Sequence, residues 1–247
     1  MFHLCFLQEF LRKFDPKLVV LKGGVNLRMY FKSRRYSEDM DLDVKTASVT
    51  SVQNNTIRAL KAIQSTLKTY GIFDLVLPSL QNAKQTETTQ RFKVHLVTKE
   101  GLDFFTKIEF SRRGFSGESR FERVDEDILR SYRLASVVAQ HYDASSAFEQ
   151  KIKALAGRSE VQARDVFDLF HLMTFIPQGF QSKLPINILK EAAVRLEDIS
   201  FEQYRDSVVS FLVDEDQVLF GRHEMWEEMQ QKVHDYLGKG KKSRRSL

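Results

Sequence analysis

The sequence is poor in cysteine and has no long hydrophobic run. Cys5 is the single cysteine in 247 residues, which excludes an intrachain disulfide and a cysteine-rich zinc site. No stretch approaches the roughly 20 consecutive apolar residues that a transmembrane helix needs. The start of the chain is rich in phenylalanine, but Glu9, Arg12 and Lys13 interrupt it and no small-residue cleavage site follows. These absences predict a soluble, cytoplasmic protein that does not enter a membrane.

Acidic residues are missing from the end of the chain. The formal net charge is +5, and the segment after Gly238 contributes five basic side chains and no acid, so the rest of the chain is close to neutral. We expect residues 239–247 to form a disordered basic tail. Such a tail either keeps the protein in solution or adds a weak, salt-dependent attraction to RNA.

The hydrophobic pattern changes along the chain. Apolar residues make up 42% of the sequence, enough for a substantial core. Period-two alternation and short β-branched runs predict strands in the first part, whereas helical periodicity dominates after Ala147. We therefore predict an α+β fold with one domain over residues 1–144 and a mainly helical domain over residues 145–238. The expected strands cover residues 18–21, 39–44, 73–77, 91–98, 103–111 and 134–142.

Two features follow one another near the start of the chain. Gly23 and Gly24 end a short apolar strand, and acids alternate with apolar residues from Asp39 to Val44. On a strand, Asp39, Asp41 and Asp43 would share one face, where their mutual repulsion favours a bound cation. A glycine turn before a helix presents backbone amides to phosphate. The pair of features predicts a Mg²⁺ site facing a phosphate cradle; the alternative is an ordinary turn beside an acidic edge strand.

A later strand supplies another acid. Glu109 lies in the alternating segment 103–111 between apolar neighbours that would face the opposite side. Sheet pairing would bring Glu109 beside Asp39 and Asp41 as a third metal ligand. The alternative is a surface glutamate paired with Lys107 or Arg112.

The segment LKGGVNLRMYFKSRRYSEDMDLDV resembles the first motif of the nucleotidyltransferase superfamily. LKGG-x-x-L-R followed by S-E-D-x-D-L is more narrowly similar to the AbiEii nucleotidyltransferase toxins and their mycobacterial MenT relatives. The resemblance implies a mixed β-sheet with flanking helices, and it makes Asp39, Asp41 and Glu109 the metal ligands. It also implies a nucleotide-binding role for the motif residues that surround them, which are Lys22, Gly23, Gly24 and Ser37.

A second signature lies more than 100 residues downstream. K-x-x-A-L-x-x-R followed by R-D-x-x-D-L resembles the carboxy-terminal signature of the same family. The resemblance implies that Lys151 and Asp165 are needed for activity, with Lys151 neutralising triphosphate charge. The nucleotide-binding residues that it adds are Lys151, Arg158, Arg164 and Asp168. On spacing alone, Arg164 and Asp168 would form an ion pair on a solvated helix face.

Together these observations predict an enzyme that transfers a nucleoside monophosphate from an NTP with Mg²⁺ or Mn²⁺. The resemblance implies a toxin that modifies the 3′ end of tRNA and is restrained by a cognate antitoxin. Two alternatives remain. One is a nucleotidyltransferase acting on a protein or small-molecule hydroxyl; the other is a non-catalytic module that binds a nucleotide or a partner.

Overall fold

The structure is a computed structural model that describes residues 1–76 and 85–239. Contacts divide the chain into two compact units. The sheet unit comprises Met1–Tyr30 and Ser37–Tyr142, and the helical unit comprises Phe31–Tyr36 and Asp143–Leu247. The domain boundary expected near residue 145 stays a prediction. The basic tail after residue 239 lies outside the described residues, as do residues 81–84 of the polar stretch 81–89, whose composition predicts a loop.

The described strands of the sheet unit form one mixed sheet. Its strand order is β3-β4-β5-β2-β1-β7-β6, with parallel pairing of β1 with β7 and of β2 with β5, and antiparallel pairing elsewhere. The strands are β1 (Val19–Lys22), β2 (Met40–Val44), β3 (Ile72–Val76), β4 (Thr89–Thr98), β5 (Asp103–Ser111), β6 (Ser119–Arg123) and β7 (Val138–Tyr142). A mixed sheet with flanking helices confirms the predicted α+β class.

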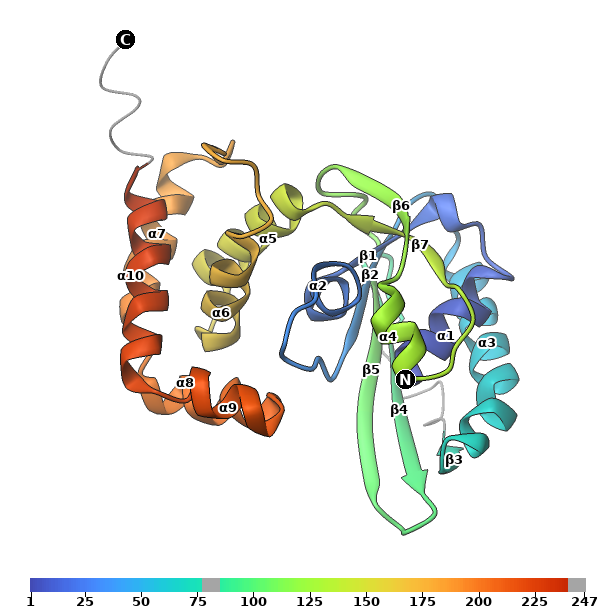
Figure 1. Ribbon diagram of the computed structural model, residues 1–247. Coiled ribbons are helices and arrows are strands. Elements are labelled where there is room, and N and C mark those ends of the chain that lie inside the picture. Colours follow the sequence, from blue (N-terminus) through green and yellow to red (C-terminus); the bar gives the residue numbers. More distant parts are fainter. Residues whose placement is uncertain (77–84, 240–247) are drawn as a thin grey trace. The chain divides into compact units, whose positions relative to one another are not determined.

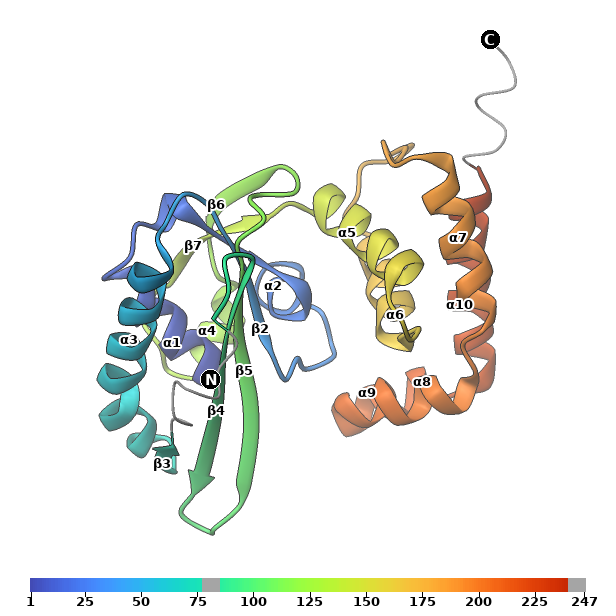
Figure 2. The same cartoon turned by 180° about the vertical axis from the view of Figure 1, so that it is seen from behind.

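Helices cover both faces of this sheet. Figures 1 and 2 show α1 and α3 on one face and α2 on the other. Phenylalanines four residues apart bring the rings of Phe6 and Phe10 together on α1, and the Phe10 ring lies 5.3 Å from that of Phe110 on β5. The helices of this unit are α1 (Phe2–Leu11), the 3-10 turn η1 (Pro16–Leu18), α2 (Gly23–Phe31), α3 (Val49–Thr69) and α4 (Glu126–Ser131).

The helical unit is built from helices that bury their apolar faces against one another. Trp226 is 2% exposed and stacks on Tyr204 with ring centroids 4.5 Å apart, so it anchors the packing of this unit. No described helix combines the length and apolar character needed to span a bilayer. The helices are α5 (Ala144–Gly157), α6 (Ala163–Leu172), α7 (Ile186–Glu197), α8 (Phe201–Ser207), η3 (Val209–Phe211), α9 (Asp214–Phe220) and α10 (His223–Lys239).

Several elements differ from those that the sequence pattern predicts. Helix α3 begins at Val49 within a polar stretch expected to be turn-like, because the side chain of Ser48 accepts a hydrogen bond from the Ser51 amide and caps the helix. Strand β6 was not expected, since its side chains are mostly exposed and lack apolar alternation. The helical pattern of residues 217–237 predicts a single helix, but the structure divides this stretch into α9 and α10 near Gly221.

Candidate functional site

The glycine turn joins β1 directly to α2. Gly23 has φ +69°, and a Cβ atom added there would lie 2.8 Å from Oδ2 of Asp41. Only glycine tolerates both this backbone conformation and this close approach. Gly23 and Gly24 are half-buried. The first amides of α2 have no helical acceptor, and they lie at the positive end of the helix dipole, so this turn favours an anion.

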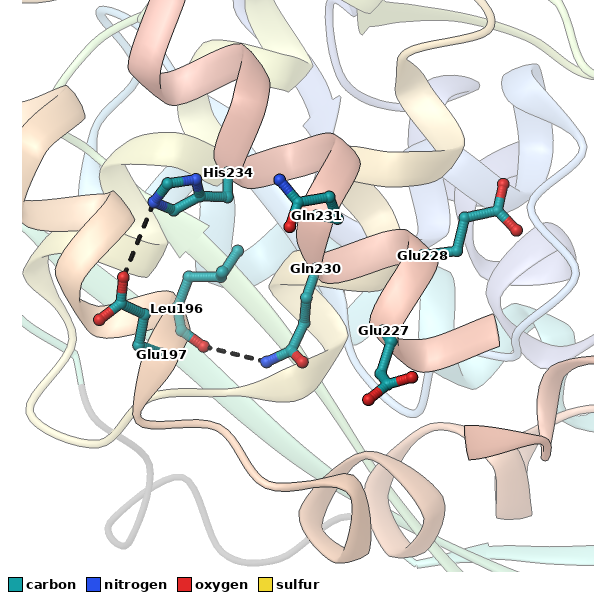
Figure 3. A pocket seen from close by; sticks show the side chains of 7 residues that line it. All are labelled: Leu196, Glu197, Glu227, Glu228, Gln230, Gln231 and His234. Carbon is teal, nitrogen blue, oxygen red and sulfur yellow. Dashed lines mark hydrogen bonds and ion pairs between the residues drawn. The ribbon is translucent and has the colours of Figure 1, made fainter. Parts of the chain in front are cut away.

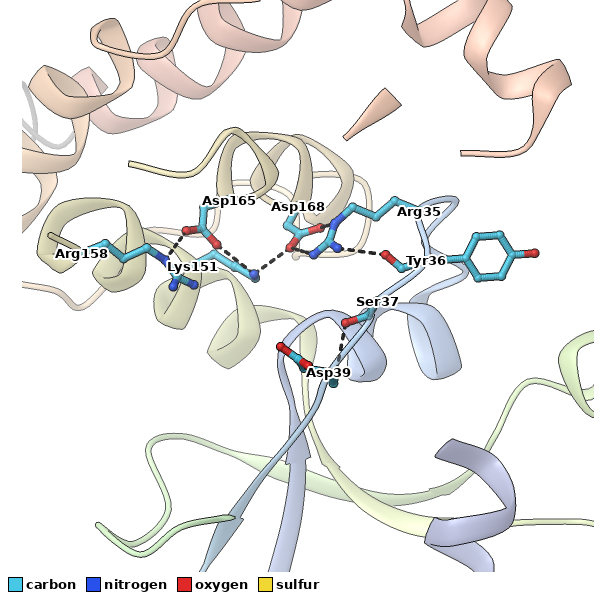
Figure 4. A network of polar contacts seen from close by, with 8 residues as sticks. All are labelled: Arg35, Tyr36, Ser37, Asp39, Lys151, Arg158, Asp165 and Asp168. Carbon is cyan, nitrogen blue, oxygen red and sulfur yellow. Dashed lines mark hydrogen bonds and ion pairs between the residues drawn. The ribbon is translucent and has the colours of Figure 1, made fainter. Parts of the chain in front are cut away.

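Strand β2 brings the expected acids together. It lies between β1 and β5, with Asp41 opposite Lys22 on β1 and opposite Glu109 on β5. Register partners point to the same face of a sheet, so Asp41 and Glu109 project together beside the glycine turn. Asp39 comes just before β2, and its backbone carbonyl accepts a hydrogen bond from the Ser37 hydroxyl at 3.1 Å (Figure 4).

Basic side chains hold two of these acids. Asp39 accepts a hydrogen bond from the Lys107 amide and lies 2.8 Å from Lys107 Nζ. Glu109 forms an ion pair with Arg91, its partner across the β4–β5 ladder, at 2.6 Å. The partner of Glu109 is therefore Arg91, and neither Lys107 nor Arg112 as the alternative predicted. Lys107 pairs with Asp39, and Arg112 donates a hydrogen bond to the carbonyl oxygen of Ala47.

Asp43, also on β2, is held by different partners. Its carboxylate is buried, lies 2.6 Å from Lys22 Nζ and accepts a hydrogen bond from the Tyr142 hydroxyl. Burial, together with this bond to Asp43, raises the pKa of Tyr142 well above its usual range, so the phenol remains a donor. Asp43 therefore ties β2 to β1 and β7, and it holds Lys22 in the same contact.

The arrangement of donors can be tested against a divalent cation. Within residues 1–76 and 85–239, no three His, Cys, Asp or Glu side chains gather closely enough to hold a metal as they stand. Mg²⁺, however, usually takes only one or two carboxylates and fills its shell with water and substrate phosphates. Asp41, its register partner Glu109 on β5, and Asp39 two residues earlier in the chain supply that chemistry beside an anion-favouring turn. The residues fit a cation that binds together with the triphosphate.

The helical unit contains a buried network of charges. Figure 4 shows Lys151 between Asp165 and Asp168, with Nζ 2.9 Å from Asp165 Oδ1 and 2.7 Å from Asp168 Oδ2. Arg158 contacts the other oxygen of Asp165 at 2.7 Å. Arg35 binds Asp168 through two hydrogen bonds of 2.9 and 2.7 Å. Lys151 on α5 is thus fixed by two acids of α6.

Burial distinguishes this network from a surface cluster. Asp165 and Asp168 are 0% exposed, so they do not form the solvated helix face that spacing alone favoured. Burial by itself raises the pKa of Asp168, but the adjacent charges of Arg35 and Lys151 outweigh it and hold that pKa below its usual range. Asp168 is therefore paired with Arg35 and Lys151 rather than with Arg164.

Arg35 is the residue of this network that sequence reasoning missed. It is 6% exposed and lies within the first segment, between LKGG-x-x-L-R and S-E-D, at none of the positions that define the motif. The adjacent arginines at positions 34 and 35 were the only available signal, and paired basic residues are usually solvated. The partner of Arg35 lies 133 positions away, which no local pattern encodes.

An open hollow of about 720 Å³ also lies on the helical unit, between α7 and α10 (Figure 3). Glu197, Glu227 and Glu228 line it together with Gln230 and His234. None of the expected site residues contributes to this hollow, and its three carboxylates would repel a triphosphate. We therefore place the candidate site at the carboxylates and the glycine turn.

Comparisons with known proteins identify a matching family and solved structures of similar fold. The family model described as "Nucleotidyl transferase AbiEii toxin, Type IV TA system" matches residues 5–239. The structure of JHP933 from Helicobacter pylori is similar, with a TM-score of 0.54, 18% identity and coverage of 98% of this chain and 93% of that one. The MenT4 nucleotidyltransferase toxin of Mycobacterium tuberculosis gives a TM-score of 0.55 at 16% identity, over 95% and 81% of the two chains. No curated protein sequence matches significantly.

Proposed function

Because this chain belongs to the AbiEii nucleotidyltransferase toxin family of type IV toxin–antitoxin systems, we propose that it transfers a nucleoside monophosphate from an NTP to an acceptor hydroxyl and releases pyrophosphate. The observation that carries the proposal is that Asp41 and Glu109 are register partners on neighbouring strands. Gly23 lies beside Asp41, and its lack of a side chain leaves space next to that carboxylate. Carboxylates and a phosphate-binding turn are the parts that nucleotidyl transfer requires.

The residues of the sheet unit have distinct roles in this reaction. Asp39, Asp41 and Glu109 would hold a divalent cation, Mg²⁺ or Mn²⁺, which polarises the α-phosphate and offsets the charge of the phosphates. The amides that begin α2 donate hydrogen bonds to phosphate oxygens. A carboxylate of the set accepts the proton of the acceptor hydroxyl as the new O–P bond forms and the bond to pyrophosphate breaks.

The helical unit contributes to the proposed reaction through the residues of the second family signature. That signature assigns activity to Lys151 and Asp165, with Lys151 compensating charge on the leaving pyrophosphate. The contacts within the unit support a fixed orientation of Lys151, since two buried acids hold it. Arg158, Arg164 and Asp168 are supporting candidates.

We further propose that the acceptor is the 3′ end of tRNA and that a cognate antitoxin restrains the enzyme. Membership in a type IV toxin–antitoxin family supports the antitoxin, and the resemblance of the two signatures implies the tRNA acceptor. The acceptor is identified by incubating the purified protein with labelled NTPs and, separately, with RNA, protein and small-molecule pools. Label in RNA supports the proposal, whereas label only in protein or a small compound would assign another acceptor.

Asp41→Asn tests catalysis itself. We expect nucleotide transfer to fall by at least about a hundredfold, because the substitution removes a metal-binding charge while keeping the shape of the side chain. Asp235→Asn, at an exposed acid of α10, is the matched control and should retain activity. If Asp41→Asn inhibits growth as strongly as the parent, the protein acts as a binding module and the catalytic proposal is wrong.

A further inference from the structure

The β4–β5 hairpin carries a polar and aromatic face that continues from the candidate site. Figure 1 shows the hairpin projecting beyond the neighbouring strands. Cross-strand register partners are Arg91 with Glu109, Lys93 with Lys107, and His95 with Phe105. Opposite residues and residues two apart point to the same side of a sheet. We call the surface formed by Arg91, Lys93, His95, Phe105 and Lys107 the ribbon face.

The ribbon face is the open side of the hairpin. The opposite side is core, since Phe92, Val94 and Ile108 are at most 4% exposed. Phe105, in contrast, is 72% exposed. The ring of His95 stacks on Phe105 with centroids 4.5 Å apart and planes 10° from parallel, and His95 also contacts Asp103 at 2.7 Å. His95 therefore holds the Phe105 ring in a fixed orientation while most of that ring stays exposed.

The charge of the ribbon face favours an anion. Lys93 and Lys107 are direct register partners, and like charges in this position repel each other. Lys107 is partly neutralised by Asp39, but no acid of the described residues forms an ion pair with Lys93. A phosphate placed near Lys93 and Lys107 would relieve this repulsion.

The position of the face matches an acceptor strand. Glu109 lies beside Asp41, and Phe105 is four residues from Glu109 along β5, a distance of about 13 Å in an extended strand. A strand with its reactive end at the carboxylates would thus cross Lys93 and Lys107 before it reaches the rings. Cations for the backbone and an exposed aromatic ring for the bases are how proteins bind single-stranded nucleic acid.

We infer that the ribbon face binds the single-stranded 3′ end of the acceptor RNA, with a base stacked on Phe105 and phosphates near Lys93 and Lys107. This inference rests on the proposed nucleotidyl transfer to RNA. It assigns the acceptor to the sheet unit and to side chains outside both family signatures.

Fluorescence anisotropy with the full-length chain and a labelled single-stranded RNA of acceptor-end sequence tests the stacking contact. Phe105→Ala should weaken RNA binding about tenfold, whereas Phe105→Tyr should bind as the parent does because it keeps an aromatic ring. Phe121→Ala is the matched control, since Phe121 is a 58% exposed phenylalanine on β6. Thermal melting of each variant checks that the fold is retained.

The dependence of RNA affinity on salt tests the charge contact. Lys93→Ala should reduce the slope of log affinity against log salt by about 0.7, the value for one phosphate contact on a single strand. Lys61→Ala, at an exposed lysine of α3 on the opposite face of the sheet, should leave the slope unchanged.

The outcomes separate this inference from the proposed function. If the parent labels RNA but Phe105→Ala and Lys93→Ala bind it as tightly as their controls, the ribbon face is not the acceptor site and the nucleotidyl transfer stands. If the parent neither binds nor labels RNA, the RNA acceptor and the ribbon assignment both fail.

Discussion

At residue scale, Gly23 matters because of the side chain that it lacks. It is the first residue of α2, and a Cβ atom added there would lie 2.8 Å from Oδ2 of Asp41. Its positive φ adds a conformational requirement that other residues meet only at a cost of about 1–2 kcal/mol. Glycine is therefore required at position 23 for two reasons, the positive φ and the close approach of the Asp41 carboxylate.

Gly23→Ala should lower kcat/KM for nucleotide transfer by about a hundredfold. The added methyl group would lie 2.8 Å from Asp41 Oδ2 and must displace the carboxylate, and a shift of about 1 Å in a catalytic group has an effect of this size. Steady-state kinetics with a labelled NTP measure the change.

Gly71→Ala is the control that distinguishes the effect of the contact with Asp41 from the effect of backbone strain at a positive φ. Gly71 also has a positive φ, +81°, but a Cβ atom there would meet nothing within 4 Å. We expect this variant to lose stability to a similar extent and to keep its activity per folded molecule. Equal activity losses in both variants would contradict the role of Gly23 as the space beside Asp41.

At the scale of elements, α5 and α6 are joined by charge as well as by apolar packing. Lys151 lies in the middle of α5 and Arg158 directly follows this helix, and both contact the buried Asp165 of α6. A buried acid with two cationic partners is stable only as a complete set, because removal of one member leaves desolvated charge. This is a structural role that exists whether or not Lys151 also meets a substrate.

Asp165→Asn should lower the free energy of unfolding by about 3 kcal/mol, since Lys151 and Arg158 lose the carboxylate that neutralises them. Urea unfolding of the full chain, followed by circular dichroism, measures the change. Arg164→Ala on the same helix is the control, because Arg164 forms no ion pair with a described residue. We expect its effect to stay within about 0.5 kcal/mol. A loss below 1 kcal/mol for Asp165→Asn would show that the network does not secure α6.

At the scale of the whole molecule, ligand binding and stability are linked. An NTP bound with Mg²⁺ stabilises only the folded chain, so at about a hundredfold excess over Kd it should add about 2.7 kcal/mol to the free energy of unfolding. Thermal melting with NTP and Mg²⁺, with NTP and EDTA, and with Mg²⁺ alone measures this effect.

We expect a large rise in Tm only when NTP and metal are present together, because Asp39 and Glu109 are already paired with Lys107 and Arg91 in the free chain. Asp41→Asn should remove most of the rise. A full rise with NTP and EDTA would contradict the cation that we assign to these carboxylates.

The local hydrophobic pattern was sufficient to predict much of the sheet. Alternation along 91–98 and 103–111 predicted β4 and β5 to within two residues, because one buried face repeats every second position. The same rule failed for β6, which has no buried face to repeat. It also failed for the start of α3, where a single hydroxyl cap rather than apolar periodicity decides the first residue.

The sequence by itself determined the α+β class, the glycine turn before a helix and the acids that alternate on β2, since each depends on neighbours within a few residues. Only the tertiary structure decided that Asp43 is buried against Lys22 and Tyr142, that Asp168 pairs with Arg35, and that Lys107 and Arg91 hold the acids of the site. These pairings join strands and helices that are distant in the chain. Their partners are fixed by sheet register and burial, which arise only when the whole chain has folded.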